Sequence, residues 1–463
     1  MRIHQPSALK PTHRLLILLA AALLVRLAVL WAGMDRGLFY PDEREYVELA
    51  HNLAADNEFS YKGQPTSFRP PGFAFIMSAV FRLSGTTAPA PVRVVQIFFS
   101  LATVVVVYLL GRDGWGEQVG LIAAGIWAFY PTVLGFNNIL LTEPSCLFFV
   151  SLAGWMLLRH LQKPHAGWAF GAGLALGFGT LIRDTLFYGG LMTMLFLIGL
   201  RWWDRRSPWR QAAAFAGGLL LVLSPWIIRN TLLQGQLTMI STVGGINLYL
   251  CNSDETPLIR PGYIFITRAA QGGDGYYYDQ LFPEMRDASE TAKQNLAMRK
   301  GLAYMVANPG ITALRSLNRF VDFWGQERLV INQLLSKYYG EMPRFAVLAM
   351  ILAIFASYSL VVIAANFGYW FGKLTAFDIW GLLFIAFYTG MHTLVLGHPR
   401  YHLPLLPLLS IMAARAFLSR AEIFADWRSW RFAGALSVTA IFIAMWTIGL
   451  LYFDMDKINL LMD

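Results

Sequence analysis

Long apolar segments recur along the whole chain, from residue 15 to residue 453, with few gaps between them. A helix that crosses the hydrocarbon core of a bilayer needs about 20 predominantly apolar residues, and most of these segments approach that length. The composition agrees, because 56% of the 463 residues are apolar and only 14% are charged, whereas soluble domains average about 25% charged residues. These features argue against a soluble protein and predict an all-α polytopic membrane protein.

Eleven segments are predicted to span the membrane. They are residues 15–33, 91–110, 118–135, 144–158, 167–182, 186–200, 212–228, 344–365, 376–396, 402–418 and 433–453. The first follows a basic N-terminus, as in a signal peptide, but its apolar run is long enough to span and lacks a clear cleavage site, so an uncleaved helix is predicted. A further apolar segment, residues 72–84, is only about 13 residues long and is predicted to form a re-entrant or interfacial helix.

The placement of basic residues supports this topology. With the N-terminus inside, the loops on the cytoplasmic side contain most of the basic loop residues, as the positive-inside rule requires. These residues are Arg112, Arg159, Lys163, Arg201, Arg205, Arg206, Arg210, Lys373, Arg420, Arg428 and Arg431. Counting residues 72–84 as a span would move the RWWDRRSPWR loop outside. Membrane topology thus accounts for the net charge of +9 without a nucleic acid partner.

This topology divides the chain into three parts. Residues 1–228 are predicted to form an N-terminal transmembrane module with a first external loop at 34–90. Residues 229–342 are predicted to form a small external domain, α+β or mainly helical, with Pro309 near a helix start, and residues 343–463 supply the C-terminal membrane helices. In the first loop, the spacing of apolar residues in DEREYVELAHNLAA predicts an amphipathic helix at the membrane surface.

Three carboxylates are candidates for chemistry at the external face. Asp42 and Glu43 follow the first span, and Glu143 opens the fourth. Acids at helix N-termini also stabilise the helix dipole, so each residue has a purely structural interpretation. The functional interpretation rests on the prediction of two separate acidic sites on one face of a membrane body that is otherwise poor in carboxylates. An acid at the end of a span is energetically costly, so its presence needs a reason.

Basic and aromatic residues are predicted at the same face. Arg69 precedes a proline pair in SFRPPGF, and Arg183 ends the fifth span. His398, Arg400 and Tyr401 lie together in GHPRYHLPLLP. Guanidinium groups bind phosphate through paired hydrogen bonds, although each residue alone could be an interfacial anchor that contacts ordinary lipid phosphates.

No motif in the sequence requires a metal or a nucleotide. HExxH and GxxxxGK[ST] are both absent, and Pro399 separates His398 from His402. A divalent cation is possible, and it would be held by Asp42 and Glu143, because carboxylate oxygens suit magnesium, calcium or manganese. Cys146 and Cys251 are not expected to form a disulfide.

Five stretches then follow one another in a recognisable order. They are YPDEREYVELAHNL, FRPPGFAFIMSAVFRLSG, NNILLTEPSCLFF, SPWIIRNTLLQGQLTMISTVGGINLYLCN and HPRYHLPLLPLLSIMAA. Together they resemble the C-type (GT-C) membrane glycosyltransferases, nearest to the branch that includes protein O-mannosyltransferases and lipid A aminoarabinose transferases. The resemblance extends from about residue 15 to about residue 418. Its specificity lies in the order of the PPG, PWxxRN and RYxxPxxP elements.

The resemblance implies a GT-C fold and a polyprenyl-phosphate sugar as donor, with the lipid tail between helices and the phosphate at the external face. It identifies Asp42 with the acid that activates the acceptor and Glu143 with the second-loop acid, where related proteins often carry Asp. Arg69, Arg400 and Tyr401 match lipid-phosphate ligands. We add Glu43 as a catalytic candidate, and Arg183 and His398 as phosphate-binding candidates.

These features predict a glycosyltransferase, moving a hexosyl or pentosyl group, in a bacterial inner membrane with its active site on the periplasmic side. The chain lacks the large repeat domains of eukaryotic protein mannosyltransferases, which favours a lipid or cell-envelope glycan, such as lipopolysaccharide, as acceptor. A transporter or flippase of a lipid-linked or anionic substrate is one alternative, although Arg26 is the clearest charge within a span and no internal repeat is found. A lipid-linked glycan ligase or polymerase is the other.

Overall fold

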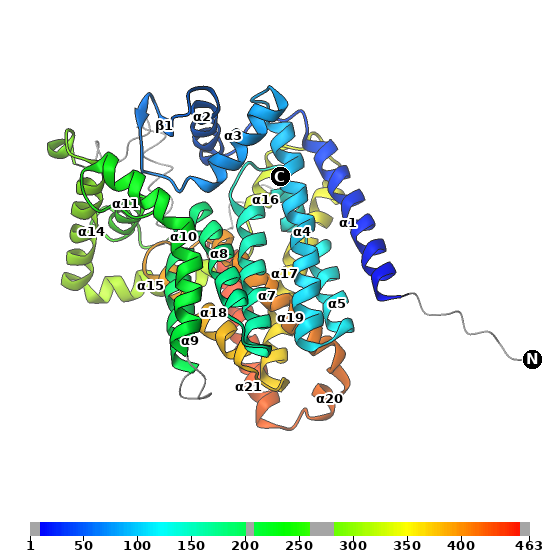
Figure 1. The fold of residues 1–463 in the computed structure, drawn as a ribbon. Coiled ribbons are helices and arrows are strands. Elements are labelled where there is room, and N and C mark those ends of the chain that lie inside the picture. The colour runs from blue at the N-terminus through cyan, green and yellow to red at the C-terminus, as the bar shows by residue number, and fades with distance from the viewer. Residues whose placement is uncertain (1–9, 201–207, 260–281, 454–463) are drawn as a thin grey trace, which may run out of the picture.

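The computed structural model of the chain describes residues 10–200, 208–259 and 282–453. Upright helices form the body of the molecule, as Figure 1 shows, with α2, α3 and β1 across one end and α11, α14 and α15 on one side. Within the described residues the only strands are β1 (Ser60–Tyr61) and β2 (Gln64–Pro65), which pair antiparallel in the first loop. The predicted all-α fold class is confirmed.

The helices have the following bounds. They are α1 (Pro11–Gly33), α2 (Pro41–Asp56), α3 (Gly72–Ser84), α4 (Pro89–Trp115), α5 (Glu117–Ala128), α6 (Pro131–Phe136), α7 (Glu143–Gln162), α8 (Ala166–Ile182), α9 (Leu186–Gly199), α10 (Pro208–Gln234), α11 (Val243–Cys251), η2 (Pro283–Met285), α14 (Glu290–Ala307), α15 (Pro309–Phe323), α16 (Leu329–Leu335), α17 (Arg344–Phe371), α18 (Ala376–Leu394), η3 (Pro399–Leu405), α19 (Leu406–Leu418), α20 (Arg420–Ala425), α21 (Trp430–Ile448) and η4 (Gly449–Phe453).

Seven helices among the described residues are long and apolar enough to cross a membrane. They are α1, α4, α7, α10, α17, η3 with α19, and α21 with η4. Helices α8 and α9 are apolar but shorter. The predicted span at 118–135 is instead two helices, α5 and α6, because Pro131 starts a new helix and the preceding Tyr130 is extended. The chain is thus an integral membrane protein, while the count of eleven spans stays a prediction.

The two helices expected in the first loop are present. Residues 72–84 form α3, and the acidic amphipathic stretch forms α2, which begins with Pro41 and has Glu43 at its third position. In the described part of 229–342 the structure has only helices and turns, and α15 begins at Pro309 as predicted. The position of α2 relative to a bilayer stays a prediction.

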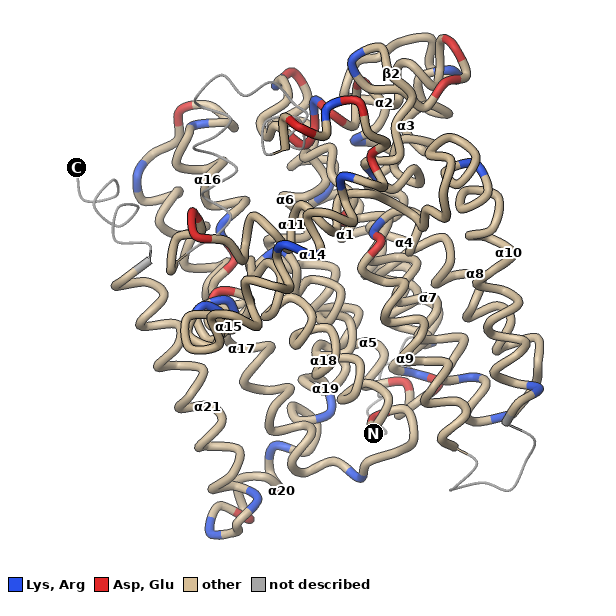
Figure 2. Tube along the Cα trace, turned by 90° about the vertical axis from the view of Figure 1, so that its left-hand side faces the viewer, with Lys and Arg blue, Asp and Glu red and all other residues tan. Residues whose placement is uncertain are grey.

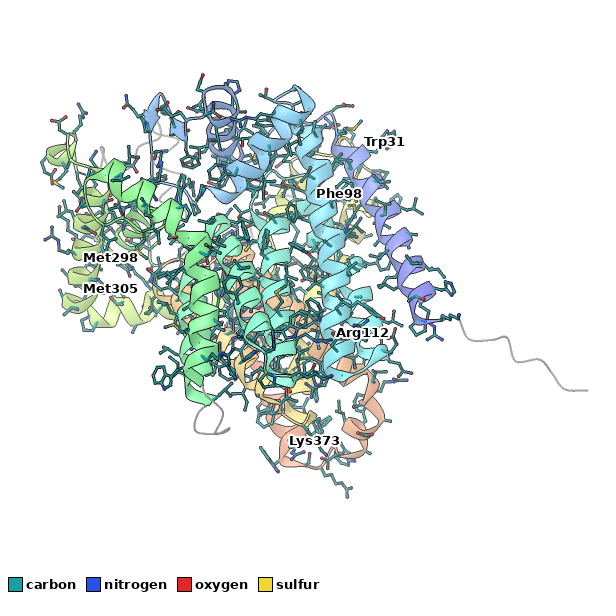
Figure 3. All side chains as sticks on the ribbon, viewed as in Figure 1. Trp31, Phe98, Arg112, Met298, Met305 and Lys373 are labelled. Atoms are coloured by element: carbon teal, nitrogen blue, oxygen red, sulfur yellow. The ribbon has the colours of Figure 1, made fainter. Side chains whose placement is uncertain are left out.

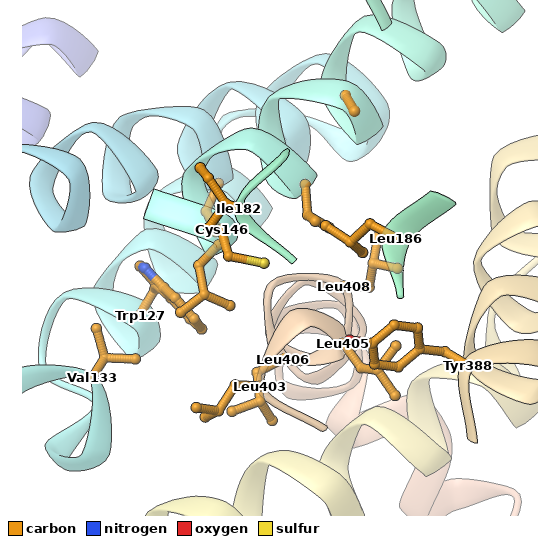
Figure 4. Packing of buried hydrophobic residues seen from close by; sticks show 14 of the residues in the cluster. Trp127, Val133, Cys146, Ile182, Leu186, Tyr388, Leu403, Leu405, Leu406 and Leu408 are labelled. Atoms are coloured by element: carbon orange, nitrogen blue, oxygen red, sulfur yellow. The ribbon is translucent and has the colours of Figure 1, made fainter. Parts of the chain in front are cut away.

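The core lies between the membrane helices. Figure 4 shows side chains from α5, α7, α8, α9, α18 and α19 meeting in one cluster, among them Trp127, Cys146, Ile182, Leu186 and Leu408. Helices α8 and α10 approach so closely that a Cβ atom on Gly173 would lie 2.0 Å from the Phe215 carbonyl oxygen. Small residues at helix crossings allow such backbone contact in membrane proteins. This contact fixes α8, the helix that ends at Arg183.

Two buried arginines join the N-terminal helices. Arg26 of α1 donates to Ser100 on α4 at 2.9 Å and to the Ala128 carbonyl oxygen of α5 at 2.8 Å. Arg93 of α4 donates to carbonyl oxygens that follow α1, including those of Gly33 and Arg36, both at 2.8 Å. Carbonyl groups at a helix end lack intrahelical partners. Arg93 therefore sets the path by which the chain leaves α1 and enters α2.

The two ends of the helix body differ in charge. Figure 2 shows Lys, Arg, Asp and Glu gathered mainly near the two ends, with a largely uncharged middle. In Figure 3, Arg112 and Lys373 both lie in the half of the molecule away from α2 and α3. Both residues belong to loops for which the sequence predicts the cytoplasmic side.

Candidate functional site

A cavity of about 770 Å³ lies beneath α2, where α7, α11, α14, α18 and η3 converge. Its lining includes Asp42, Arg69, Glu143, Arg183, Arg400 and Tyr401, six of the eight side chains singled out from the sequence. They come from five separate segments of the chain. The structure therefore brings together acids and arginines that the sequence only placed on one face.

Asp42 lies between two arginines. Its Oδ1 atom is 3.3 Å from Arg69 Nη2, and its Oδ2 atom accepts hydrogen bonds from Arg400 Nη1 and Nη2, each at 3.2 Å. Pro41 starts α2 and fixes its first turn, which directs Asp42 toward the cavity. Arg400 stands on η3, 358 residues further along the chain.

Glu45, which the sequence analysis did not single out, is the second partner of Arg69. Its Oε2 atom is 2.6 Å from Arg69 Nη2. The Arg69 guanidinium also lies 5.8 Å from the ring centre of Tyr46 and 5.5 Å from that of Phe68. Glu45 is three residues after Asp42, so both carboxylates share one helix face. This three-residue spacing could have identified Glu45 from the sequence as a neighbour of Asp42.

The charges around Asp42 determine its ionisation. Burial alone would raise the pKa of the Asp42 carboxyl, but Arg69 and Arg400 hold it below its ordinary value. Burial alone would lower the pKa of the Arg69 guanidinium, but Glu45 and Asp42 raise it well above its ordinary value. Asp42 is therefore a carboxylate at neutral pH, and a weak base while both arginines contact it.

Glu143 and Arg183 form a second, more deeply buried pair. Glu143 Oε1 is 2.8 Å from Arg183 Nη2, and the two side chains are only 1% and 9% exposed. Arg183 also lies 5.3 Å from the ring centre of Tyr401. Breaking such a pair leaves an unpaired buried charge, which costs about 3–5 kcal/mol. The pair thus fixes Glu143 in place.

Several polar atoms of the cavity residues have no hydrogen-bond partner among the described residues. They are Glu143 Oε2, Arg183 Nη1, Arg69 Nε and His392 Nε2, all buried. Buried polar groups in folded proteins are nearly always hydrogen-bonded. A carboxylate oxygen and guanidinium N–H groups are therefore available to a polar ligand.

His392 is a further cavity residue that the sequence analysis missed. It stacks on Tyr401, with ring centres 4.6 Å apart. Its Nδ1 atom is 3.3 Å from the Leu396 carbonyl oxygen, and because a carbonyl can only accept, Nδ1 carries the proton. Nε2 is then an acceptor. A single histidine near the end of an apolar span gave no signal in the sequence.

Glu43 and His398 do not line the cavity. The Glu43 carboxylate accepts backbone N–H bonds from Phe39, Tyr40 and Leu140, at 2.7–2.8 Å, and burial raises the pKa of its carboxyl group. His398 accepts the backbone N–H of Arg400 at 3.1 Å and caps η3. Glu43 thus connects the start of α2, which carries Asp42, to the turn before Glu143.

A buried contact holds η3 beneath the cavity. His402 is fully buried, with Nε2 3.2 Å from Glu327 Oε1 and Nδ1 2.6 Å from the Phe323 carbonyl oxygen. Its ring stacks on Tyr358, with ring centres 4.5 Å apart. These contacts position the turn that presents Arg400 and Tyr401.

The carboxylates do not fit a divalent cation shared by Asp42 and Glu143. Both oxygens of Asp42 and one of Glu143 face arginines, and a metal at that place would meet their positive charge. Among the described residues, no three His, Cys, Asp or Glu side chains gather as metal ligands would. The donor set present here is instead suited to an anion.

Residues 68–228, less than half of the chain, match the family model of dolichyl-phosphate-mannose-protein mannosyltransferases. No curated protein sequence matches the chain. The matched segment contains Arg69, Glu143 and Arg183.

The fold is similar to that of the archaeal oligosaccharyltransferase AglB from Archaeoglobus fulgidus. The complex of that protein with an inhibitory peptide and a dolichol-phosphate has 13% sequence identity and a TM-score of 0.53, over 93% of this chain and 54% of AglB. The apo form of the Archaeoglobus fulgidus oligosaccharyltransferase has 14% identity and a TM-score of 0.52, over 92% and 55%. This chain therefore spans about half the length of these structures.

A further solved structure is that of ArnT from Cupriavidus metallidurans bound to undecaprenyl phosphate. It has 13% identity and a TM-score of 0.45, over 96% of this chain and 72% of ArnT. The match of residues 68–228 and the fold shared with AglB confirm the resemblance to the C-type membrane glycosyltransferases, and the chain has their fold.

The contacts of Glu43 predict that it supports the structure and takes no direct part in catalysis. Glu43→Gln replaces an oxygen that accepts backbone N–H bonds by an amide group, and hydrogen bonds to a charged group contribute about 1.5–3 kcal/mol each. We expect a lower melting temperature of the purified protein in detergent, with turnover of the folded fraction retained. Glu58→Gln is the matched control, because Glu58 is exposed. Wild-type stability combined with lost turnover would contradict this role.

Proposed function

Because the chain has the C-type glycosyltransferase fold, we propose that it transfers a glycosyl group from a polyprenyl-phosphate-linked donor to a hydroxyl group of a lipid or glycan acceptor. The observation that carries the proposal is the single cavity lined by Asp42, Glu143 and three arginines. A glycosyl transfer of this kind needs a base for the acceptor and positive charge for a departing phosphate. The cavity supplies both.

The arginines are the proposed ligands of the donor phosphate. Arg69, Arg183 and Arg400 all line the cavity, and guanidinium groups bind phosphate oxygens in pairs. Negative charge grows on the phosphate oxygen as the bond to the sugar breaks. Fixed positive groups stabilise that charge in the transition state without having to reorganise. The ring centre of Tyr401 lies 5.1 Å from the guanidinium carbon of Arg400 and 5.3 Å from that of Arg183. The ring therefore orients both side chains.

Asp42 is the proposed base. The acceptor oxygen forms a bond to the anomeric carbon, the bond from that carbon to the phosphate oxygen breaks with its electron pair on phosphate, and the acceptor proton passes to Asp42. The transition state has oxocarbenium character, as in glycoside chemistry. When the donor phosphate engages Arg69 and Arg400, those guanidinium groups neutralise Asp42 less. The basicity of Asp42 therefore rises when the donor binds.

Glu143 is the proposed positioning group for the acceptor or the sugar. One of its oxygens is fixed by Arg183, at 2.8 Å. The other oxygen has no partner among the described residues and can accept a hydrogen bond from a hydroxyl group of a substrate. A carboxylate that accepts such a bond orients the hydroxyl without forming a covalent bond to it.

The proposed site of action is the periplasmic face of a bacterial inner membrane. Arg112 and Lys373 both lie in the half of the molecule away from α2 and α3, as Figure 3 shows. If basic loops mark the cytoplasmic side, the cavity opens on the other side. A lipid-linked sugar supplies its own leaving group there, so no nucleotide is needed.

The transporter alternative gains no support from Arg26. This residue is fully buried and donates to Ser100 and to the carbonyl oxygens of Ala22 and Ala128. Its contacts are those of a structural bridge between helices. A ligase or polymerase remains within the same chemistry and differs only in its acceptor.

Substitution of the two acids tests the proposed roles. With a radiolabelled polyprenyl-phosphate sugar, Asp42→Asn should lower the transfer rate by about 10²- to 10⁴-fold, the range for loss of a general base. Glu143→Gln should also lower the rate, because it disrupts the pair with Arg183. Asp56→Asn is the matched control on the same helix, since Asp56 is exposed. If both folded variants keep wild-type rates, the acids are not catalytic.

The pH dependence gives a separate test. In the free enzyme the pKa of Asp42 is below its ordinary value, which is about 3.9 for Asp. The pH dependence of kcat/KM reports pKa values of the free enzyme, and that of kcat reports pKa values of the enzyme–substrate complex. The acid limb of kcat/KM should therefore lie below about pH 4. The acid limb of kcat should lie at higher pH, because bound phosphate engages the arginines. The reverse order of the two limbs would contradict the proposal that the arginines contact phosphate instead of Asp42 when the donor is bound. Recovery of activity on return to neutral pH is the control for unfolding.

A further inference from the structure

Helix α15 is polar on the side that faces the protein and apolar on the side that faces outward. Its buried residues are Arg315, Arg319, Asp322 and Phe323. The opposite face carries Ala313, Leu314 and Leu317, of which the two leucines are 45% and 59% exposed. A helix on a protein surface in water has the opposite arrangement.

The inward arginines donate hydrogen bonds to neighbouring carbonyl oxygens and to an asparagine side chain. Arg319 donates to the Leu394 carbonyl oxygen at 2.7 Å and to Asn252 Oδ1 at 3.2 Å. Arg315 donates to the Ser253 carbonyl oxygen at 3.1 Å. These bonds hold α15 against α11 and the end of α18. The outward leucines therefore do not result from a loosely packed helix that could rotate.

The exposed side of α14 changes character along its length. Arg299 and Lys300 are exposed near its middle, whereas Leu302 and Val306, which follow, are 49% and 82% exposed. From Leu302 to Ser336 every charged residue is buried. These residues are Arg315, Arg319, Asp322, Glu327 and Arg328. The second half of α14 and all of α15 thus present an uncharged outer surface.

The position of α15 in the fold matches this polarity. Figures 1 and 2 show α15 level with the upright helices of the body, instead of beyond their ends. It packs against α18, which also carries exposed apolar side chains, Leu382 and Leu383, whereas Phe387 and Leu394 of α18 line the cavity. Helix α15 is therefore placed at the depth of the apolar helices, and its outward face is apolar as theirs are.

We propose that the α14–α15 corner, residues 302–317, is embedded in the cavity-side half of the bilayer, and that its outward face contacts lipid acyl chains. At 15 residues, α15 is shorter than the roughly 20 residues needed to cross the bilayer. A helix satisfies its own backbone in lipid, and burial of the arginines against protein removes the charges that lipid would exclude. Lipid is favoured over a second protein copy because every exposed residue of this corner is apolar, whereas protein interfaces have a polar rim.

Helix α14, which leads into the corner, also forms a wall of the cavity. Met298, Leu302 and Met305 on α14 line it, and Figure 3 shows Met298 and Met305 along that helix. The cavity is then beside the hydrocarbon layer on this side of the molecule. This placement does not depend on the reaction carried out in the cavity.

Spin labelling of the protein in phosphatidylcholine vesicles tests the proposal. A nitroxide is attached at Leu317→Cys, and in separate variants at Leu314→Cys and Val306→Cys, so that one poorly folded variant does not decide the result. Collisions with oxygen, which concentrates in lipid, are compared with collisions with a water-soluble nickel complex. The native cysteines, Cys146 and Cys251, are fully buried, and the unsubstituted protein serves as the labelling blank.

Two reference positions calibrate the measurement. Leu360→Cys on α17 lies on a membrane helix at a site that is 67% exposed, and Arg299→Cys lies on the charged part of α14. The three corner positions should match Leu360, with high exposure to oxygen and low exposure to nickel. Values like those of Arg299 would overturn the proposal. Shielding from both reagents would also overturn it, because a second protein copy would then cover the face.

Discussion

The cavity depends on the pairing of two carboxylates, one partly and one fully buried, with arginines from distant parts of the chain. Asp42 is held by Arg69 from the first loop and by Arg400 from η3, while Glu143 is held by Arg183. An unpaired charge in such a place would be strongly unfavourable. The pairs therefore fix α2 relative to η3, and α7 relative to the end of α8. They also leave cations that can bind an anionic group in competition with the carboxylates.

The sequence predicted most of the charged side chains that converge on the cavity, because acids and arginines are rare near the ends of its apolar segments. The sequence did not predict which acid pairs with which arginine. Glu45 was overlooked beside Asp42, and His392 was overlooked because a single histidine in an apolar span has no distinctive spacing. Glu43 was grouped with Asp42, although their neighbouring positions on a helix point in different directions. Glu43 instead accepts backbone N–H groups.

The fold was predictable to a similar extent. Apolar length and charge placement located the membrane helices, the short α3 and the acidic α2. The break between α5 and α6 was missed because Pro131 lies within a continuous apolar run. An apolar composition does not show that a proline disfavours a helical conformation in the residue before it. The orientation of α15 was also not predicted. Amphipathic spacing alone does not decide whether the polar face of a helix points outward to water or inward to backbone carbonyl groups.

An experimental structure of the protein with polyprenyl phosphate, solved beside the ligand-free form, is the most direct test of the central claim. We predict that the phosphate lies within hydrogen-bond distance of Arg400 and of Arg69 or Arg183, and that Asp42 has lost at least one of its arginine contacts. A phosphate bound elsewhere, with the contacts of Asp42 to Arg69 and Arg400 unchanged, would contradict the account.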